Sequence, residues 1–187
     1  MLLLICGPSG SGKSTLATAV LQQAADAAVI RQDDYFTQPF LPYSARVDDS
    51  FETAENIDWD KLCTDTADQE ASVVVVEGHM VATQHQRMWQ LCQAHSRRLV
   101  CVVLQSSLAQ CKQRRLFRRP RSDEDMAELK AYIEQYMWPA HLSHGVAAIE
   151  QLESTRESPI VTIDTTDGRT AEEYLLQVLT ACDEERQ

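Results

Sequence analysis

The feature that most constrains this chain is a glycine-rich loop near its amino terminus. The loop reads Gly7-Pro8-Ser9-Gly10-Ser11-Gly12-Lys13-Ser14-Thr15 and fits the pattern G-x-x-x-x-G-K-[ST]. An apolar run precedes it at Leu2–Cys6, and apolar residues at helical spacing follow it. Its glycines let backbone N–H groups point inward, and the positive end of the following helix completes a concavity for phosphate oxygens. A strand–loop–helix unit that binds a nucleoside triphosphate is therefore predicted. A glycine-rich turn with a chance lysine is the weaker alternative.

The side chains of this loop have distinct expected roles. Lys13 reaches the β- and γ-phosphates in such loops, and the Ser14 hydroxyl is a ligand for Mg²⁺. The remaining expected ATP contacts from the loop are Gly7, Ser9, Gly10, Ser11, Gly12 and Thr15. ATP as co-substrate and Mg²⁺ as cofactor are thus predicted.

Short apolar runs recur along the rest of the chain. They are continuous rather than alternating, which is typical of strands covered on both faces of a parallel sheet. The runs are residues 2–6, 27–30, 73–76, 99–104 and 159–163. Helical patterns lie between them, and Thr170 with Glu173 forms a capping box before the last one. We expect a three-layer α/β/α fold with a five-stranded, mostly parallel sheet, in one domain over residues 1–187.

Two stretches depart from this alternation. Residues 33–58 read as an extended loop rich in aromatic side chains, and residues 108–152 read as helices. Those helices are expected to break near Arg119-Pro120-Arg121 and at Trp138-Pro139, because proline ends or kinks a helix. Long insertions in a compact domain are usually functional. We expect an acceptor-binding loop at about 33–58 and a lid at about 112–122.

Carboxylates follow two of the predicted strands. Asp33 comes after the second run and Glu77 ends the third, and the carboxyl ends of parallel strands open onto the ligand crevice. Asp33 is placed to accept the proton of an attacking hydroxyl and to hold Mg²⁺, and Glu77 to orient Mg²⁺ waters or the substrate. Loop-capping or solvent-facing acids are the weaker alternatives. His79 is expected to be a structural or solvent-facing loop residue, and no motif surrounds His141 or His144.

The net charge argues against large polyanionic partners. The chain has 28 acidic and 17 basic residues, formally −11, whereas a nucleic-acid or anionic-membrane binder normally carries a basic surface. Six basic residues and no acidic one nevertheless lie between positions 112 and 121. Without them the rest of the chain has 28 acids against 11 bases, formally −17. A concentrated basic segment in an acidic protein requires an explanation.

Arginine spacing supplies one explanation for this basic segment. On a helix Arg114 and Arg118 share one face, and Arg115 and Arg119 share the adjacent face. Guanidinium groups match phosphate oxygens and neutralise charge, so the segment is interpreted as a lid over the phosphates. A solvated helix face and a nucleic-acid patch are the alternatives.

The cysteines and apolar runs indicate a cytoplasmic setting. Six cysteines show no CxxC pair, and most lie in apolar stretches, as buried free thiols do. No apolar run approaches the ~18 residues of a membrane span, and the start of the chain is read as a strand rather than a signal peptide. The chain also lacks an NKxD segment and an LSGGQ-like signature, which argues against a GTPase and an ABC-type ATPase.

Several segments together resemble a known family, the nicotinamide riboside kinases, within the broader uridine kinase–phosphoribulokinase group of P-loop kinases. The segments that carry the resemblance are residues 5–15, Gln32-Asp33-Asp34-Tyr35-Phe36, Val76-Glu77-Gly78, Cys111-Lys112-Gln113-Arg114-Arg115 and Tyr136-Met137-Trp138-Pro139. The resemblance covers nearly the whole chain. The departures are Glu52 where aspartate is usual, Thr37 where lysine is common, and Arg119-Pro120-Arg121 in the lid.

The resemblance implies a role for each matching position. Asp33 matches the proton acceptor and Mg²⁺-linked carboxylate, and Glu77 the essential strand-end acid. Phe36 matches a position that packs on the nucleoside, and Phe51-Glu52 an aromatic–acid pair that stacks on the base and grips the ribose hydroxyls. The remaining matches are the lid arginines Arg114, Arg115 and Arg118, and the loop beside the adenine, with Asp167 and Arg169.

These patterns lead to one functional hypothesis with open alternatives. The chain is expected to transfer the ATP γ-phosphate to the 5′-hydroxyl of a ribonucleoside, with nicotinamide riboside as first choice. The expected catalytic residues are Asp33, Lys13, Glu77 and Arg115, and the expected metal ligands are Ser14, Asp33 and Glu77. The alternatives are a uridine/cytidine kinase, a kinase of another small hydroxy-metabolite, and a non-catalytic nucleotide-binding regulatory module. A monomer or homodimer without nucleic-acid or membrane partners is expected.

Overall fold

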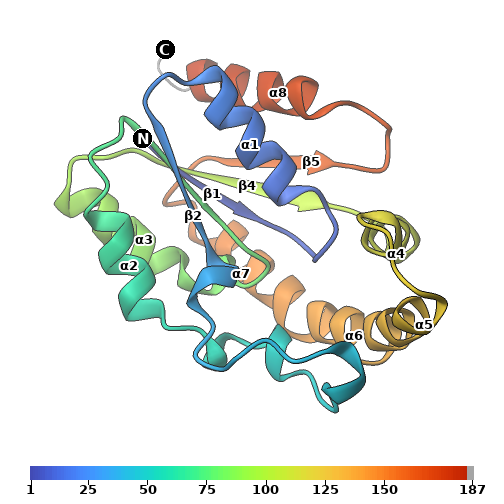
Figure 1. Ribbon diagram of the computed structural model, residues 1–187. Helices are drawn as coiled ribbons and strands as arrows, with labels where there is room; N and C mark the ends of the chain where they lie inside the picture. Colours follow the sequence, from blue (N-terminus) through green and yellow to red (C-terminus); the bar gives the residue numbers. More distant parts are fainter. Residues whose placement is uncertain (185–187) are drawn as a thin grey trace.

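Five parallel strands form the centre of the computed structural model, which describes residues 1–184, in the order β2-β3-β1-β4-β5 (Figure 1). The strands are β1 (Leu2–Cys6), β2 (Ala27–Arg31), β3 (Val73–Glu77), β4 (Leu99–Gln105) and β5 (Ile160–Asp164). The predicted α/β fold with a five-stranded sheet is confirmed. Residues 185–187, the end of the expected domain, lie outside the described residues.

Helices cover both faces of this sheet (Figure 1). Leu3 and Ile5 of β1 face the core under α1 (Lys13–Gln23) and α8 (Ala171–Glu184). Leu2, Leu4 and Cys6 face the opposite core, which is covered by α2 (Trp59–Ala67), α3 (His85–Ala94) and α7 (Val146–Thr155). Every β1 residue is buried, because both faces of the strand are covered, and this explains the continuous apolar runs in the sequence.

The strand order fixes where the ligand crevice lies. β1 is flanked by β3 and β4, and the chain fills the β2–β3 side of β1 before it crosses to the β4–β5 side. In such a sheet the crevice lies at the carboxyl end of the strands where the order reverses. The glycine-rich loop leaves β1 at that point.

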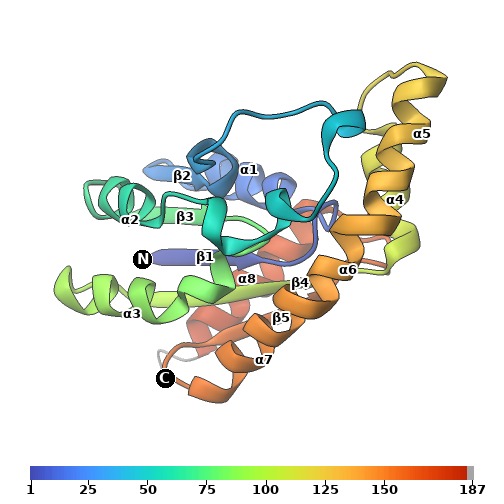
Figure 2. The same ribbon diagram turned by 90° about the horizontal axis from the view of Figure 1, so that it is seen from below.

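A long helical segment from residue 123 to residue 155 contains Pro139 in its interior. It comprises α5 (Asp123–Tyr132), a π-helical turn at Ile133–Met137, α6 (Trp138–Ala140), a second π-helical turn at His141–Gly145, and α7 (Figure 2). The predicted break at Trp138-Pro139 is therefore wrong. Trp138 keeps helical torsions, φ −74° and ψ −43°, and the wider π turns on both sides accommodate a residue that lacks an N–H. The predicted break at Arg119-Pro120-Arg121 is confirmed, between α4 (Leu108–Phe117) and α5.

Residues 33–58 form a loop whose two ends are joined. Figure 2 shows the middle of this loop reaching α5. Phe36 and Ile57 form an isolated antiparallel bridge, and Thr37 N donates to Asn56 O at 2.9 Å. Between these ends the chain makes only short 3-10 turns. A short helix that the sequence analysis did not predict, α2, follows directly, with Asp58 accepting from Lys61 N at its start.

Two further sequence expectations are resolved by local contacts. The capping box is confirmed, because Thr170 N donates to Glu173 Oε2 at 2.7 Å and Glu173 N donates to Thr170 Oγ1 at 3.3 Å. The cysteines are free thiols, and all but Cys63 are buried. Within residues 1–184, no helix combines the length and the apolar character needed to cross a bilayer.

Candidate active site

The glycine-rich loop closes tightly between β1 and α1. Gly7, Gly10 and Gly12 all have positive φ, at 140°, 92° and 106°, a region that favours glycine. A Cβ on Gly7 would lie 2.4 Å from Leu104 O, and one on Gly10 would lie 2.7 Å from Cys111 O. Gly12 is the N-cap of α1 and has no side chain to occupy the first-turn N–H groups, which leaves them available to an anion.

Two polar side chains of this loop are buried. Lys13 is 8% exposed, and its Nζ donates to Pro8 O at 2.9 Å. Burial lowers the pKa of Lys13, and the Glu77 and Asp33 carboxylates oppose that shift. The Ser11 hydroxyl is buried and has no hydrogen-bond partner among residues 1–184. A buried hydroxyl without a partner costs about 1–3 kcal/mol, so this group suits a phosphate oxygen as acceptor.

Two acids stand where the adjacent strands end. Glu77 closes β3, and its Oε1 accepts from Ser14 Oγ at 2.9 Å. Burial raises the pKa of Glu77, while Lys13 and the Ser14 hydroxyl oppose that shift. Asp33, on the turn after β2, is exposed and lines the same cavity as Glu77. Asp34 is also exposed but does not line this cavity.

A cavity of about 690 Å³ lies between the glycine-rich loop, α4 and the start of α8. This volume falls within the ~300–1,000 Å³ typical of small-molecule sites. Most of the expected site residues line it, namely Ser9, Gly10, Ser11, Gly12, Lys13, Ser14, Thr15, Asp33, Glu77, Arg114, Arg115, Arg118 and Arg169. Gly7 and Asp167, both expected to bind ATP, do not line it.

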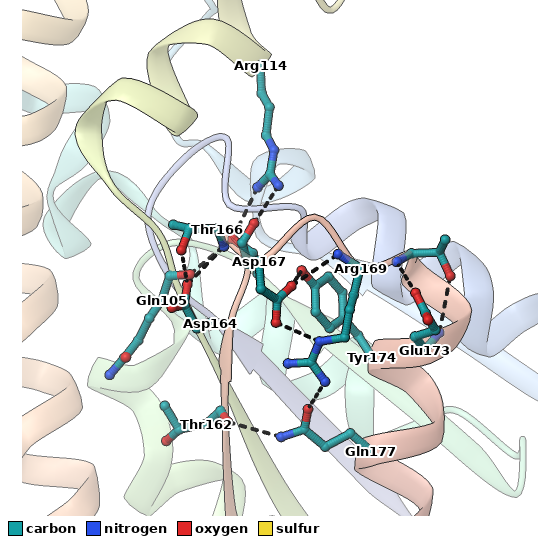
Figure 3. A network of polar contacts seen from close by, with 12 residues as sticks. Gln105, Arg114, Thr162, Asp164, Thr166, Asp167, Arg169, Glu173, Tyr174 and Gln177 are labelled. Atoms are coloured by element: carbon teal, nitrogen blue, oxygen red, sulfur yellow. Dashed lines mark hydrogen bonds and ion pairs between the residues drawn. The ribbon is translucent and has the colours of Figure 1, made fainter.

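The lid arginines do not all point freely into this cavity. Arg114, labelled in Figure 3, donates from Nη1 to Thr165 Oγ1 at 3.1 Å and from Nη2 to Thr165 O at 2.7 Å. Its Nη1 also donates to Ser11 O at 3.1 Å. Arg115 donates to Ser9 Oγ and, at 3.1 Å, to Tyr43 OH. Arg114 thus braces the glycine-rich loop against the segment after β5, and Arg115 joins it to the 33–58 loop.

The other basic residues of the segment differ in what they contact. Arg121 donates to Arg115 O and Leu116 O, both at 3.0 Å, and so satisfies carbonyls at the end of α4. Lys112 pairs with Glu134 on the neighbouring helix. Arg118 lines the cavity. The basic segment therefore combines structural caps with groups that face the cavity.

A polar network holds the segment between β5 and α8 (Figure 3). Asp167 accepts from Arg169 Nε at 2.6 Å and from Tyr174 OH at 2.8 Å. The Arg169 guanidinium lies 5.1 Å from the Tyr174 ring centroid. Arg169 and Tyr174 line the cavity, so Asp167 orients residues that do so without lining it itself. Sequence reasoning missed Tyr174 as a site residue, although it stands four residues after Thr170 of the capping box.

Aromatic side chains of the 33–58 loop and of α5 form a box around Arg46. The Arg46 guanidinium is 4.9 Å from the centroid of Phe40, 4.6 Å from Tyr43, 4.2 Å from Phe51 and 5.0 Å from Tyr132. Arg46 is 8% exposed, and its Nε donates to Leu41 O at 3.0 Å. We call these four rings the aromatic box. Phe36 packs outside it, with its ring centroid 5.4 Å from that of Phe40 and 5.6 Å from that of Phe51.

Glu52, beside the box, is buried among polar partners. Its Oε1 accepts from Tyr132 OH at 2.8 Å, and its Oε2 lies 3.5 Å from His79 Nε2. His79 is half-buried, with 14% of its side chain exposed and its Nε2 atom buried, so the solvent-facing alternative for this residue is wrong. Burial lowers the pKa of His79, and the Glu52 carboxylate opposes that shift. Sequence reasoning missed Arg46 and Tyr132, since no motif marks either of them.

A second, much smaller cavity of about 10 Å³ adjoins Pro8 and Ser9 of the glycine-rich loop. It is lined by Pro8, Ser9, Glu52, His79, Met80, Met137, His141 and Gly145. Burial lowers the pKa of His141 to about 4. This cavity separates the glycine-rich loop from the long helical segment, and His79 borders both cavities.

Comparison with known proteins gives a family and a fold. Residues 2–139 match a protein-family model described as an AAA domain. A sugar kinase from Janibacter sp. HTCC2649 is similar, with 17% identity and a TM-score of 0.59 over 97% of this chain and 94% of that one. A gluconokinase from Sinorhizobium meliloti 1021 is similar, with 19% identity and a TM-score of 0.55 over 98% of this chain and 91% of that one. Shikimate kinase from Acinetobacter baumannii is similar, with 14% identity and a TM-score of 0.52 over 99% of this chain and 94% of that one. No curated protein sequence matches the chain.

Proposed function

The chain belongs to the AAA domain family, and on this premise we propose that it is a Mg²⁺-dependent kinase that transfers the ATP γ-phosphate to a hydroxyl group of a small molecule. One observation carries the proposal. Asp33 lines the same cavity as Lys13 and the Ser14–Glu77 pair. A carboxylate beside the phosphate loop is suited to accept the proton of an attacking hydroxyl, and a simple nucleotide-binding module has no need of one.

The residues around Ser14 fit a magnesium ion. The Ser14 hydroxyl and the Glu77 carboxylate are hydrogen-bonded at 2.9 Å, and Asp33 lines the same cavity. These are hard oxygen donors of the kind that hold Mg²⁺ beside substrate phosphates. Ser14, Glu77 and Asp33 would hold the ion directly or through water, and the bound ion would neutralise charge on the phosphates.

The protein groups divide the remaining work of phosphoryl transfer. The first-turn N–H groups of α1 and the Ser11 hydroxyl bind phosphate oxygens, and Lys13 neutralises the charge of the transferred group. Arg115 and Arg118 add positive charge from the lid side. Asp33 takes the proton as the acceptor oxygen attacks. Arg114 and Asp167 act by holding the glycine-rich loop and Arg169 in place.

For the acceptor, the aromatic box favours nicotinamide riboside. The box holds a planar cation, the Arg46 guanidinium, within 4.2–5.0 Å of four ring centroids. The nicotinamide ring of this riboside is also a planar cation, and aromatic faces attract both by the same electrostatics. The 5′-hydroxyl would then be the group that meets Asp33.

A second acceptor class, a small hydroxy-metabolite without a base, is favoured by the occupancy of the same box. Arg46 already fills the space between Phe51 and Tyr132, so a base would have to displace it. The similar structures are named sugar kinase, gluconokinase and shikimate kinase. Uridine and cytidine share a planar base with nicotinamide riboside, but their bases are neutral, so the aromatic box favours them less than the cationic ring.

A phosphotransfer panel tests the proposal. ADP release and product mass would be measured with Mg²⁺–ATP and each of nicotinamide riboside, uridine, cytidine, gluconate, shikimate, glycerate and pantothenate. We expect a phosphorylated product from at least one hydroxyl compound, with the highest kcat/KM on nicotinamide riboside. Stabilisation by Mg²⁺–ATP without turnover of any acceptor would instead support the regulatory module.

A further inference from the structure

His79 stands on the wall between the two cavities. It lines the large cavity together with Asp33 and Arg115, and the small cavity together with Glu52 and His141. The residue follows β3 directly after Gly78, at the carboxyl end of the sheet. A group that enters the large cavity from the acceptor side can therefore contact His79 without leaving the neighbourhood of Asp33.

Gln32 determines which nitrogen of His79 carries the proton. Gln32 is fully buried, and its Oε1 accepts from Met80 N at 2.8 Å, so its amide nitrogen faces His79 Nδ1 at 3.1 Å. An amide nitrogen only donates, and Nδ1 must therefore accept. The neutral ring then carries its hydrogen on Nε2. Gly78 permits this packing, because a Cβ there would lie 2.3 Å from Gln32 Oε1.

The Nε2–H group has no hydrogen-bond partner among residues 1–184. Its closest acidic atom is Glu52 Oε2 at 3.5 Å, and the other carboxylate oxygen of Glu52 is already engaged by Tyr132 OH. The buried Nε2–H donor and the Glu52 Oε2 acceptor thus face one another at the small cavity. An acceptor that leaves these buried groups without a hydrogen bond should bind more weakly, because a buried polar group is costly to leave unpaired.

We propose that His79 Nε2–H and Glu52 Oε2 together recognise one hydroxyl group of the acceptor, distinct from the hydroxyl that is phosphorylated. A hydroxyl donates and accepts at the same time, which matches this pair. A carboxylate would meet the charge of Glu52, and a methylene would leave both protein groups unpaired. The inference rests on the proposed kinase function and makes the acceptor a compound with at least two hydroxyls, one that is phosphorylated and one that meets His79 and Glu52. Glu52 is expected to grip hydroxyls from the family resemblance, whereas His79 is the new specificity-determining residue.

The size of the small cavity agrees with a single hydroxyl. A volume of about 10 Å³ is close to the ~10–15 Å³ that one water oxygen needs by the same kind of measure. The body of the acceptor then lies in the large cavity, and only one hydroxyl reaches between His79 and Glu52. Larger substituents at that position would clash with Met137 or His141, which line the same small cavity.

The test pairs deoxy acceptors with His79 variants. The best acceptor from the panel and its analogues, each lacking one hydroxyl other than the phosphorylated one, would be assayed with the wild type, His79→Leu and His79→Gln. In the wild type we expect one analogue to lose about 10- to 100-fold in kcat/KM, as for one buried hydrogen-bonding group. In His79→Leu, kcat/KM for the parent acceptor should fall by the same factor, and removing the hydroxyl from the acceptor should cause no further fall. KM for ATP should stay unchanged.

His79→Gln and His95→Ala complete the design. Glutamine restores an N–H donor at about the reach of Nε2, so His79→Gln should recover part of the discrimination. His95 is exposed at the end of α3, and His95→Ala should match the wild type. The inference would be overturned, while the kinase function stands, if wild type and His79→Leu discriminate equally between the parent acceptor and its deoxy analogue. Equal rises of KM for ATP and KM for the acceptor in His79→Leu would overturn it as well. Absence of turnover with every acceptor would overturn the proposed function and, with it, this inference.

Discussion

The proposed nucleotide side and the proposed acceptor side of this molecule, below called the nucleotide side and the acceptor side, are built on different principles. On the nucleotide side the recognition groups are backbone N–H groups of a loop held between β1 and α1, and the cavity is open at about 690 Å³. On the acceptor side the groups are side chains of the 33–58 loop and α5, and they bind one another. Arg46 fills the aromatic box, Tyr132 holds Glu52, and the remaining space is about 10 Å³.

This difference shows which half of the site has to change on substrate binding. Backbone donors of a glycine-rich loop are fixed by the fold, so these donors need not move when a phosphate binds. Side chains that satisfy one another must exchange those contacts for contacts with the acceptor. Arg115 connects the halves, because it donates to Ser9 on the glycine-rich loop and to Tyr43 on the 33–58 loop. A change in the 33–58 loop on acceptor binding is therefore expected to shift Arg115 and, through it, the glycine-rich loop that binds the phosphates.

The largest expected effect separates chemistry from nucleotide binding. Asp33→Asn keeps the size and the polarity of the side chain but removes the base, so kcat should fall by about 10²- to 10⁴-fold. The stabilisation of the protein by Mg²⁺–ATP, measured as the rise in Tm, should remain. Asp34→Asn is the matched control, because Asp34 is exposed and does not line the cavity. Wild-type turnover in Asp33→Asn would remove Asp33 as the base.

An intermediate effect is expected from opening the aromatic box. Arg46→Met removes a cation that contacts four rings, so Tm should fall by about 2–8 °C. An acceptor with a planar cationic ring no longer has to displace the guanidinium, and its KM should fall about fivefold, the factor that ~1 kcal/mol represents. Arg46→Lys keeps the charge and should keep the wild-type KM.

The same variant distinguishes the two acceptor classes. For an acceptor without a base, Arg46→Met should leave KM unchanged or raise it, because the box then serves only to stabilise the loop. KM for ATP should not move in either case, since Arg46 does not line the nucleotide cavity. Parallel rises in KM for ATP and acceptor would contradict the assignment of the box to the acceptor side.

On the nucleotide side the sequence predicted which residues lie together, while their roles stay predictions. The positions of Lys13, Asp33 and Glu77 follow from strand ends and from one local motif, and all three line one cavity. The five strands were found from their continuous apolar runs, which are clearest in the almost fully buried strands β1, β3 and β4. Local pattern and backbone geometry were sufficient there.

The acceptor side depended on contacts that no local pattern encodes. Tyr132 meets Glu52 across 80 positions of sequence, and His79 meets Gln32 across 47. Arg46 has no neighbouring motif, and its burial follows only from the folding of the whole loop around it. Pro139 misled the helix prediction, because the π turns that accommodate it are not visible as a residue pattern.

The smallest expected effect is a pH dependence that arises on the acceptor side. Burial lowers the pKa of His141 from 6.5 to about 4. The unfolded chain therefore binds this proton near pH 6.5 and the folded chain only near pH 4, so stability should decrease as pH falls through that window. His141→Gln should flatten the decrease, measured as the free energy of unfolding in urea between pH 7.5 and 4.5. His95→Gln, at an exposed position, should leave the slope of the wild type unchanged. An identical slope in His141→Gln would show that the buried imidazole does not set the stability of this half of the site.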